Sequence, residues 1–223
     1  SDLMMTNKKL IGVRDPFGIR PLVIGKLKSS YIFASETCAL DIIGAKFVRY
    51  VENGEIVVIE DNKITSTKPF PEKKARPCAF EYIYFARPDS LIDHKCAYDY
   101  RKNMGVELAR ETGLVADLVV PVPDSGVPAA LGYSQFSKKE FELGLIRNHY
   151  VGRTFIEPTQ NIRSFGVKLK LNPNQTIIKN KSIVLVDDSL VRGTTCHKIV
   201  KMLYDAGAKE VHVRIACPEI LYP

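Results

Sequence analysis

The stretch IVLVDDSLVRGTT, from Ile183 to Thr195, decides how this 223-residue chain folds. Its apolar start, Ile183 to Val186, predicts a buried strand. Asp187 and Asp188 follow at the carboxyl end of that strand, and a turn rich in glycine and hydroxyl groups then leads into a helix. In parallel α/β sheets, ligands bind at the carboxyl ends of the strands. The stretch therefore predicts a ligand site as well as a fold.

Each part of this stretch suits a sugar phosphate. The N–H groups of Arg192 to Thr195, with the helix N-terminus behind them, predict a cradle for a phosphate, and Gly193 lets the backbone approach it closely. Carboxylates would repel a phosphate, but Asp187 and Asp188 can accept hydrogen bonds from ribose hydroxyls or bind Mg²⁺ directly or through water. The competing interpretation is that Asp188 or Ser189 merely caps the helix, which would explain one carboxylate but not two.

From residue 78 onward, strand-like and helix-like segments alternate along the chain. Such alternation predicts a parallel sheet with helices on both faces. The expected strands are residues 79–85, 118–122, 144–146, 182–186 and 211–216. The expected helices are residues 98–112, 195–206 and a third that begins with residues 127–133.

The first 60 residues have a different pattern. Short apolar strands are expected at residues 10–13, 22–24, 31–34 and 55–59, with turns between them. A helix is expected over residues 37–43, with Ser35 as its N-cap. The polar, lysine-rich stretch 62–77 contains three prolines, which predicts a linker between two domains.

Composition and charge narrow the class of protein. Hydrophobic residues make up 45% and charged residues 26%, and no apolar run is long enough to cross a bilayer, so a cytoplasmic protein is expected. The net charge of +7 suits a polyphosphate substrate as well as nucleic acid, but the chain has no tryptophan and no basic block, so nucleic acid is not expected. The five cysteines are dispersed, which predicts reduced thiols rather than disulfides or a zinc site.

The stretch from Ile183 to Thr195 resembles the signature of type I phosphoribosyltransferases. Further motifs are similar to those of the glutamine phosphoribosylpyrophosphate amidotransferases. They are RDPFGIRPL (14–22), SETCA (35–39), CAFEYIYFARPDS (78–90), VPDS (122–125) and YVGRTFI (150–156). The resemblance runs from about Gly12 to Pro218 and so covers nearly the whole chain.

This resemblance implies two domains. Residues 78–223 would form a type I phosphoribosyltransferase domain, in which helices flank a parallel sheet, incomplete at its C-terminal end. Residues 1–64 would be the C-terminal part of an N-terminal-nucleophile (class II) glutaminase, an α+β domain also called a type 2 glutamine amidotransferase domain. Residues 65–77 would link the two.

The resemblance also implies site residues. Asp187 and Asp188 would bind the ribose hydroxyls and Mg²⁺, and Ser125 would lie near the metal. The diphosphate loop would run from Val122 to Ser125, although Pro123 to Gly126 is by its chemistry also an ordinary tight turn. The residues implied to bind substrate are Asp187, Asp188, Ser189, Val191, Arg192, Gly193, Thr194, Thr195, Pro123 and Asp124.

The basic region from Arg147 to Asn172 has little periodicity. The resemblance implies a loop that closes over the substrate, neutralises the departing diphosphate and excludes water from a ribosyl cation. The candidate side chains are Arg153, Arg163, Lys168 and Lys170. A solvated surface is the competing interpretation for each of them, and no residue stands out as a general acid or base.

The implied reaction makes 5-phosphoribosylamine from phosphoribosyl diphosphate and glutamine-derived ammonia, the first step of de novo purine biosynthesis. Mg²⁺ would be required, purine nucleotides would act as feedback inhibitors, and a full-length protein would form a homo-oligomer. Neither a membrane nor nucleic acid is expected as a partner. The alternatives are a regulator that binds phosphoribosyl diphosphate without catalysis and an inactive remnant.

The chain departs from the family pattern in two places. The family's glutaminase begins with a catalytic cysteine, whereas this chain begins with Ser1 and its first cysteine is Cys38, so we expect an internal fragment that uses ammonia rather than glutamine. Cys78 matches a ligand position in those members that carry a [4Fe–4S] cluster. Such a cluster needs four cysteines and cannot be completed within this chain. An ordinary buried thiol is the competing interpretation of Cys78.

Overall fold

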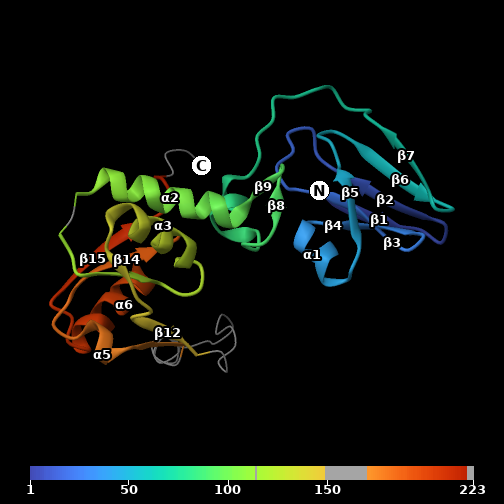
Figure 1. Ribbon diagram of the computed structural model, residues 1–223. Coiled ribbons are helices and arrows are strands. Elements are labelled where there is room, and N and C mark those ends of the chain that lie inside the picture. The colour runs from blue at the N-terminus through green and yellow to red at the C-terminus, as the bar shows by residue number, and fades with distance from the viewer. Residues whose placement is uncertain (114, 149–169, 220–223) are drawn as a thin grey trace. The chain divides into compact units, whose positions relative to one another are not determined.

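The computed structural model describes residues 1–113, 115–148 and 170–219, and the chain forms two compact units, Ser1–Tyr100 and Arg101–Pro223 (Figure 1). Each unit has its own sheets and its own hydrophobic core. Within the described ranges, no helix is both long enough and apolar enough to cross a membrane.

The first unit contains two antiparallel sheets that pack on each other. One has the order β1-β2-β6-β7, with β1 Asp2–Met5, β2 Lys9–Val13, β6 Ile56–Glu60 and β7 Lys63–Thr67. The other has the order β4-β3-β5, with β3 Val23–Leu27, β4 Ser30–Ala34 and β5 Lys46–Tyr50. The core between them consists of Leu22, Ile24, Phe33, Val51, Val57 and Ile59.

Helix α1, Thr37–Ile42, packs on the other face of the β4-β3-β5 sheet. Successive strand residues point to opposite faces. Ile24 therefore lies in the core between the sheets, whereas Val23 packs against Leu40 of the helix. The predicted helix is confirmed.

Two details predicted for this unit are wrong. Glu36, not Ser35, occupies the cap position of α1, and its carboxylate instead accepts hydrogen bonds from Ser90 Oγ at 2.7 Å and from the Arg87 N–H at 2.8 Å. Part of the stretch 62–77 that was predicted as a linker is strand β7, which pairs with β6 through a tight turn. Its alternating threonines and isoleucine suit a strand, although its lysines suggested a linker.

The strand predicted over residues 79–85 is also wrong, because this segment is helical, with the π-helix η1 over Glu81–Phe85. A short apolar run fits a strand and a buried helix equally well, so its neighbours decide. Here Glu81 is 3% exposed, and its carboxylate pairs with Arg20 Nε at 2.8 Å. Two short strands, β8 Leu91–Ile92 and β9 Lys95–Cys96, follow as a hairpin.

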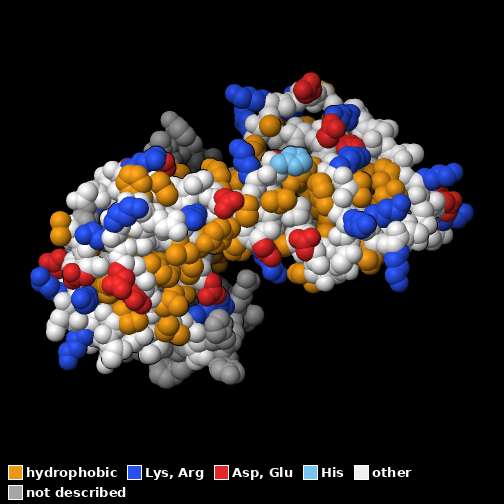
Figure 2. Space-filling view, in the orientation of Figure 1, with side chains coloured by type: hydrophobic (Ala, Val, Ile, Leu, Met, Phe, Trp, Pro, Cys, Tyr) orange, Lys and Arg blue, Asp and Glu red, His pale blue; other side chains and the backbone are white. Residues whose placement is uncertain are grey.

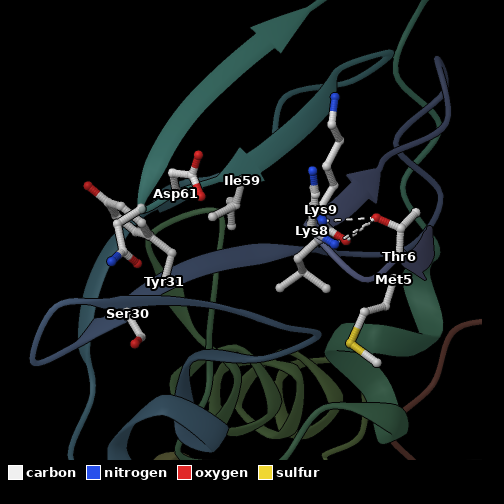
Figure 3. A pocket seen from close by; sticks show the side chains of 10 residues that line it. Met5, Thr6, Lys8, Lys9, Ser30, Tyr31, Ile59 and Asp61 are labelled. Carbon is white, nitrogen blue, oxygen red and sulfur yellow. Dashed lines mark hydrogen bonds between the residues drawn. The ribbon is translucent and has the colours of Figure 1, made fainter.

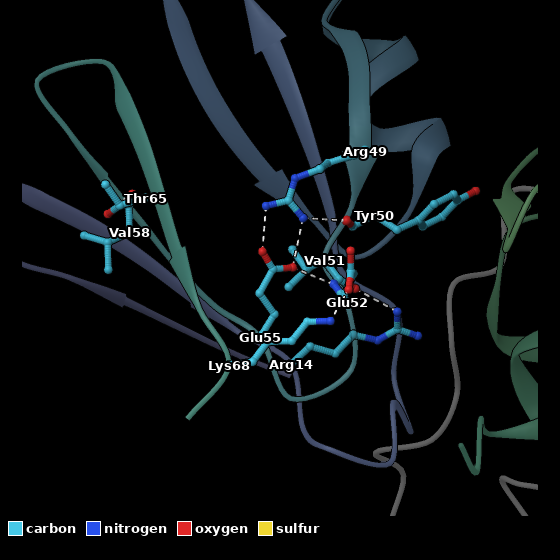
Figure 4. A network of polar contacts seen from close by, with 9 residues as sticks. All are labelled: Arg14, Arg49, Tyr50, Val51, Glu52, Glu55, Val58, Thr65 and Lys68. Atoms are coloured by element: carbon cyan, nitrogen blue, oxygen red, sulfur yellow. Dashed lines mark hydrogen bonds and ion pairs between the residues drawn. The ribbon is translucent and has the colours of Figure 1, made fainter. Parts of the chain in front are cut away.

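Glu55 is a buried carboxylate held by its neighbours (Figure 4). Arg49 binds it with both terminal nitrogens, at 2.7 and 2.8 Å, and the Glu52 backbone N–H donates to it at 2.7 Å. Beside this pair, Arg14 Nη1 donates to Val51 O at 2.8 Å. Burial by itself raises the pKa of Glu55, but the hydrogen bonds from Arg49 and Glu52 outweigh burial and hold that pKa below its usual value.

The second unit is built on a parallel sheet with the order β11-β10-β14-β15, which confirms the predicted fold class. The strands are β10 Leu118–Pro121, β11 Glu140–Phe141, β14 Ser182–Asp187 and β15 Glu210–Ile215. The helices are α2 Ala97–Glu111, α3 Val127–Ser137, α5 Gln175–Ile178 and α6 Thr194–Asp205.

The central strand β14 is buried on both faces, as its apolar run predicted. Ile183 and Leu185 share a core with α5 and α6 on one face, and Val184 and Val186 share a second core with α2 and α3 on the other. Figure 1 shows α2 and α3 on one side of the sheet and α6 on the other. The strand predicted at residues 144–146 exists as β12, Leu145–Arg147, but it pairs antiparallel with β13, Leu171–Pro173, outside the parallel sheet.

Helices α2 and α3 approach each other at two glycines. A Cβ built on Gly105 would lie 1.8 Å from Ala129 O, and a Cβ built on Gly132 would lie 1.9 Å from Lys102 O. Both contacts are with backbone atoms, which cannot move aside as a flexible side chain can. The crossing of these helices therefore depends on glycine.

Gly105→Ala should destabilise the chain by about 1–3 kcal/mol. The added methyl group would overlap Ala129 O, and the free-energy cost of that overlap exceeds the gain of about 1 kcal/mol in helix propensity. The midpoint of urea unfolding measures this change. Gly113→Ala is the matched control, since apart from its chain neighbours no described residue comes within 4 Å of its Cβ position. Equal midpoints for the two variants would contradict the close crossing.

Glu55→Gln should destabilise the chain by about 2 kcal/mol near neutral pH, because it removes a charge that is hydrogen-bonded to Arg49. The folded-state pKa of Glu55 is lowered, so its stabilisation is present above the unfolded-state pKa and is lost as pH falls through the folded one. The difference in urea midpoint between variant and unaltered chain should therefore shrink on acidification. Glu60→Gln, whose pair with Lys9 is about half exposed, should change the midpoint little at either pH.

Candidate functional site

The two carboxylates of the candidate site stand at the end of β14, where neighbouring strands fix the backbone. On one side, the Val122 N–H donates to Val186 O at 2.8 Å. On the other, the Ala216 N–H donates to Asp187 O at 2.9 Å and the Cys217 N–H donates to Asp188 O at 2.8 Å. The sheet pairing thus holds both aspartates at the carboxyl edge, as the sequence predicted.

Asp187 keeps a charge in an unfavourable place. Its pKa is raised to about 6, chiefly by burial and further by the neighbouring charge of Asp188, against a hydrogen bond from the Asp188 N–H to Asp187 Oδ1 at 2.9 Å. Asp188 is 8% exposed, and its carboxylate accepts a hydrogen bond from Ser189 Oγ. None of the ion pairs among the described residues includes either aspartate. Buried carboxylates without a cation are typical of a site that binds one.

The turn after these carboxylates leaves the N-terminus of α6 open. Gly193 precedes the helix with a φ of 71°, in the left-handed region that favours glycine, and apart from its chain neighbours no described residue comes within 4 Å of its Cβ position. No side chain caps the helix, so the interpretation of Asp188 or Ser189 as a mere cap is wrong. Thr194 and Thr195 are exposed on the first turn. Free N–H groups, hydroxyls and the positive end of the helix dipole together suit a phosphate.

A second loop reaches the same edge of the sheet. It follows β10, which pairs with β14 so that Pro121 lies opposite Val186. A Cβ built on Gly126 would lie 2.5 Å from Val186 O, so the loop from Pro123 to Gly126 runs directly against the end of β14. The Pro123–Asp124 peptide bond is cis. Parallel pairing therefore brings the predicted diphosphate loop to the same sheet edge as the two aspartates.

Arg147 makes a contact with this loop that the sequence did not suggest. Arg147 is the last residue of β12, and its Nη1 forms an ion pair with Asp124 Oδ2. The next residue, Asn148, donates its N–H to Lys170 O at 2.8 Å and so extends the β12–β13 ribbon. Of the predicted loop cations, only Lys170 is among the described residues. The others, Arg153, Arg163 and Lys168, lie outside them.

Two cysteines that were interpreted as ordinary thiols lie near the carboxylates. Burial raises the pKa of Cys196, and the charge of Asp187 raises it further. Burial also raises the pKa of Cys217, and the charge of Asp188 raises it further. Their spacing in the sequence could not have predicted this proximity, because Cys196 lies in the first turn of α6 and Cys217 follows β15. All five cysteines are free thiols, and no group of three or more metal-ligating side chains occurs in the described ranges.

The first unit has an open hollow at one end of its two sheets (Figure 3). Met5, Leu10 and Ile59 form its apolar part, and Lys8 and Asp61 stand at its rim with opposite charges. It contains none of the predicted site residues. On the face seen in Figure 2, basic and acidic side chains are interspersed over the coloured residues of each unit.

Comparison with known proteins gives a consistent result in sequence and in structure. The chain is 60% identical to an amidophosphoribosyltransferase of Rhizobium etli over 100% of the chain and 46% of that protein. It is 52% identical to an amidophosphoribosyltransferase of Synechocystis over 98% of the chain and 45% of that protein. No protein-family model matches the chain.

Among solved structures, the chain matches the glutamine phosphoribosylpyrophosphate amidotransferase of B. subtilis complexed with ADP and GMP. The TM-score is 0.91 and the identity 48%, over 99% of this chain and 49% of that one. The chain thus spans about half the length of the curated relatives it matches. Within that span, the chain is similar in both sequence and fold to these amidophosphoribosyltransferases.

Proposed function

We propose that this chain acts as an amidophosphoribosyltransferase, which makes 5-phosphoribosylamine from phosphoribosyl diphosphate and ammonia, in the cytoplasm. One observation carries the proposal. Among the described residues, neither Asp187 nor Asp188 forms an ion pair, and both stand at the end of buried β14, next to the uncapped helix N-terminus behind Gly193. Carboxylates for hydroxyls or a metal, side by side with a cradle for a phosphate, suit a ribose phosphate.

The proposed contacts divide the substrate into three parts. Asp187 and Asp188 accept hydrogen bonds from the ribose hydroxyls. The turn from Val191 to Thr195 holds the 5′-phosphate through N–H groups and threonine hydroxyls. The loop from Pro123 to Ser125 takes the diphosphate. Ser189 supports this arrangement by donating to Asp188.

Mg²⁺ fits the donors that this edge provides. Two carboxylates and the Ser125 hydroxyl are oxygen ligands, and Mg²⁺ is usually held by one or two carboxylates together with substrate phosphates. When bound, it would supply positive charge to the departing diphosphate. An iron–sulfur cluster does not fit the residues present, because Cys78 belongs to no group of three or more metal ligands in the described ranges.

In the proposed reaction, the nitrogen of ammonia forms a bond to C1 of the ribose as the bond from C1 to the diphosphate oxygen breaks. The residues of the chain contribute position and charge rather than covalent chemistry. We keep Arg153, Arg163, Lys168 and Lys170 as candidates for neutralising the leaving diphosphate. We further propose purine nucleotides as inhibitors, since a nucleoside monophosphate shares the ribose 5-phosphate group, and the B. subtilis relative was solved with ADP and GMP.

Asp187→Asn combined with Asp188→Asn should abolish diphosphate release from phosphoribosyl diphosphate, ammonia and Mg²⁺, by at least about 100-fold. The same variant should fold normally and unfold at an equal or higher urea concentration at neutral pH, because two crowded charges are removed. Glu107→Gln, an exposed residue of α2, is a control with the same chemical change. Binding without release by the unaltered chain would favour the regulator, and neither binding nor release would favour the inactive remnant.

Sugar-phosphate binding should strengthen as pH rises through about 6, because an ionised Asp187 accepts hydrogen bonds from hydroxyls with both oxygens and more strongly than a protonated one does. Stability should change in the opposite direction. A carboxyl whose folded-state pKa is raised contributes stability that is fully present below its unfolded-state pKa and is lost as pH rises through the folded one. Calorimetric titration of ribose 5-phosphate and urea unfolding at several pH values measure the two effects. In Asp187→Asn, both pH dependences should flatten.

A further inference from the structure

The loop proposed to take the diphosphate carries a negative charge of its own. Asp124 is exposed, and a carboxylate at close range repels an anionic ligand. Without a compensating cation, the loop would weaken the binding of its own ligand. The structure supplies that cation, because Arg147 Nη1 pairs with Asp124 Oδ2.

The backbone at both ends of the loop is already fixed. The Val122 N–H donates to Val186 O at 2.8 Å, and the Gly126 N–H donates to Val122 O at 2.9 Å. The close approach of Gly126 to Val186 O holds the loop against β14. The pair with Arg147 is therefore a contact at the tip of a loop whose base does not depend on it.

Arg147 belongs to a different element from the loop. It ends β12, and the antiparallel pairing of β12 with β13 continues through the Asn148 N–H, which donates to Lys170 O. The side chains of Arg147 and Asp124 are 47% and 58% exposed. A pair this exposed adds little to the stability of the fold. Its effect is local: it cancels one charge on the loop and joins the loop to the ribbon.

We propose that Arg147 is a positioning residue of the diphosphate loop, which neutralises Asp124 and ties the loop to the β12–β13 ribbon. It acts through Asp124 and not by contact with the ligand. The role rests on the proposed function, because a diphosphate must bind this loop for the neutralisation to matter.

A double-mutant cycle with two ligands tests this role. Inorganic diphosphate and ribose 5-phosphate, each with Mg²⁺, are titrated calorimetrically into the 223-residue chain, Arg147→Gln, Asp124→Asn and the double variant. Arg147→Gln should weaken diphosphate binding about five- to tenfold, since one full charge is left unpaired on the loop. It should leave ribose 5-phosphate binding unchanged. Adding Asp124→Asn should restore diphosphate affinity to within about twofold, because no charge then needs neutralising.

Each other outcome counts against the proposal. If the double variant binds diphosphate as weakly as Arg147→Gln alone, Arg147 contacts the diphosphate itself. Unchanged diphosphate binding in Arg147→Gln would mean that the pair has no role. If the unaltered chain binds ribose 5-phosphate but not diphosphate, the positioning role fails while the ribose phosphate site stands. If it binds neither ligand, the proposed function fails and the positioning role fails with it.

Two controls separate the proposed role from general effects. Arg110→Gln removes the same charge from an exposed pair with Glu107 on α2 and should leave both affinities unchanged. The urea midpoints of the four chains should agree closely, as expected for an exposed ion pair. A parallel drop in ribose 5-phosphate binding and in the midpoint would show that the effect of Arg147→Gln is structural, which overturns the role.

Discussion

Strand β14 pairs in parallel with β10 on one side and β15 on the other, and the candidate site takes its geometry from this pairing. The strand is buried up to Val186, and Asp187 and Asp188 follow. Their backbone carbonyl oxygens accept hydrogen bonds from the N–H groups of Ala216 and Cys217, which follow β15. The pairing with β10 brings the second loop to the same edge. A central strand of a doubly wound sheet can hold polar groups rigidly only at its end, where the cores on its two faces stop.

The end of β14 combines two features that suit a ligand better than they suit stability. Asp187 keeps a carboxylate where burial opposes its charge, and α6 begins after a glycine with positive φ. Like α1, α3 and α5, α6 has no side-chain cap, so its first N–H groups can reach a ligand. By contrast, Glu55 is buried deeper in the first unit but is fully paired with Arg49. Among the described residues, two carboxylates outside any ion pair and a helix N-terminus without a side-chain cap thus share one edge, which is typical of a functional site.

Much of the second unit could be predicted because its strands are apolar runs between clear turn and helix signals. The run from Ile183 to Val186 needs two covered faces, and only a central parallel strand supplies them. The errors came from short segments. Residues 79–85 have no periodicity that separates a strand from a helix, and the pairing of buried Glu81 with Arg20 is a contact distant in sequence that no local pattern shows. Ser35 has a side chain suited to capping a helix, but Glu36 occupies the cap position of α1 and accepts a hydrogen bond from Ser90 instead.

The identity and order of the groups at the site follow from the sequence, because a strand, two carboxylates and a glycine turn are consecutive residues and local chemistry fixes their arrangement. Tertiary structure decided what meets them. Arg147 reaches Asp124 only because an antiparallel ribbon ends beside the loop after β10. Cys196 and Cys217 come near the aspartates because α6 begins and β15 ends at the same edge. Such contacts join residues distant along the chain, so no local pattern encodes them.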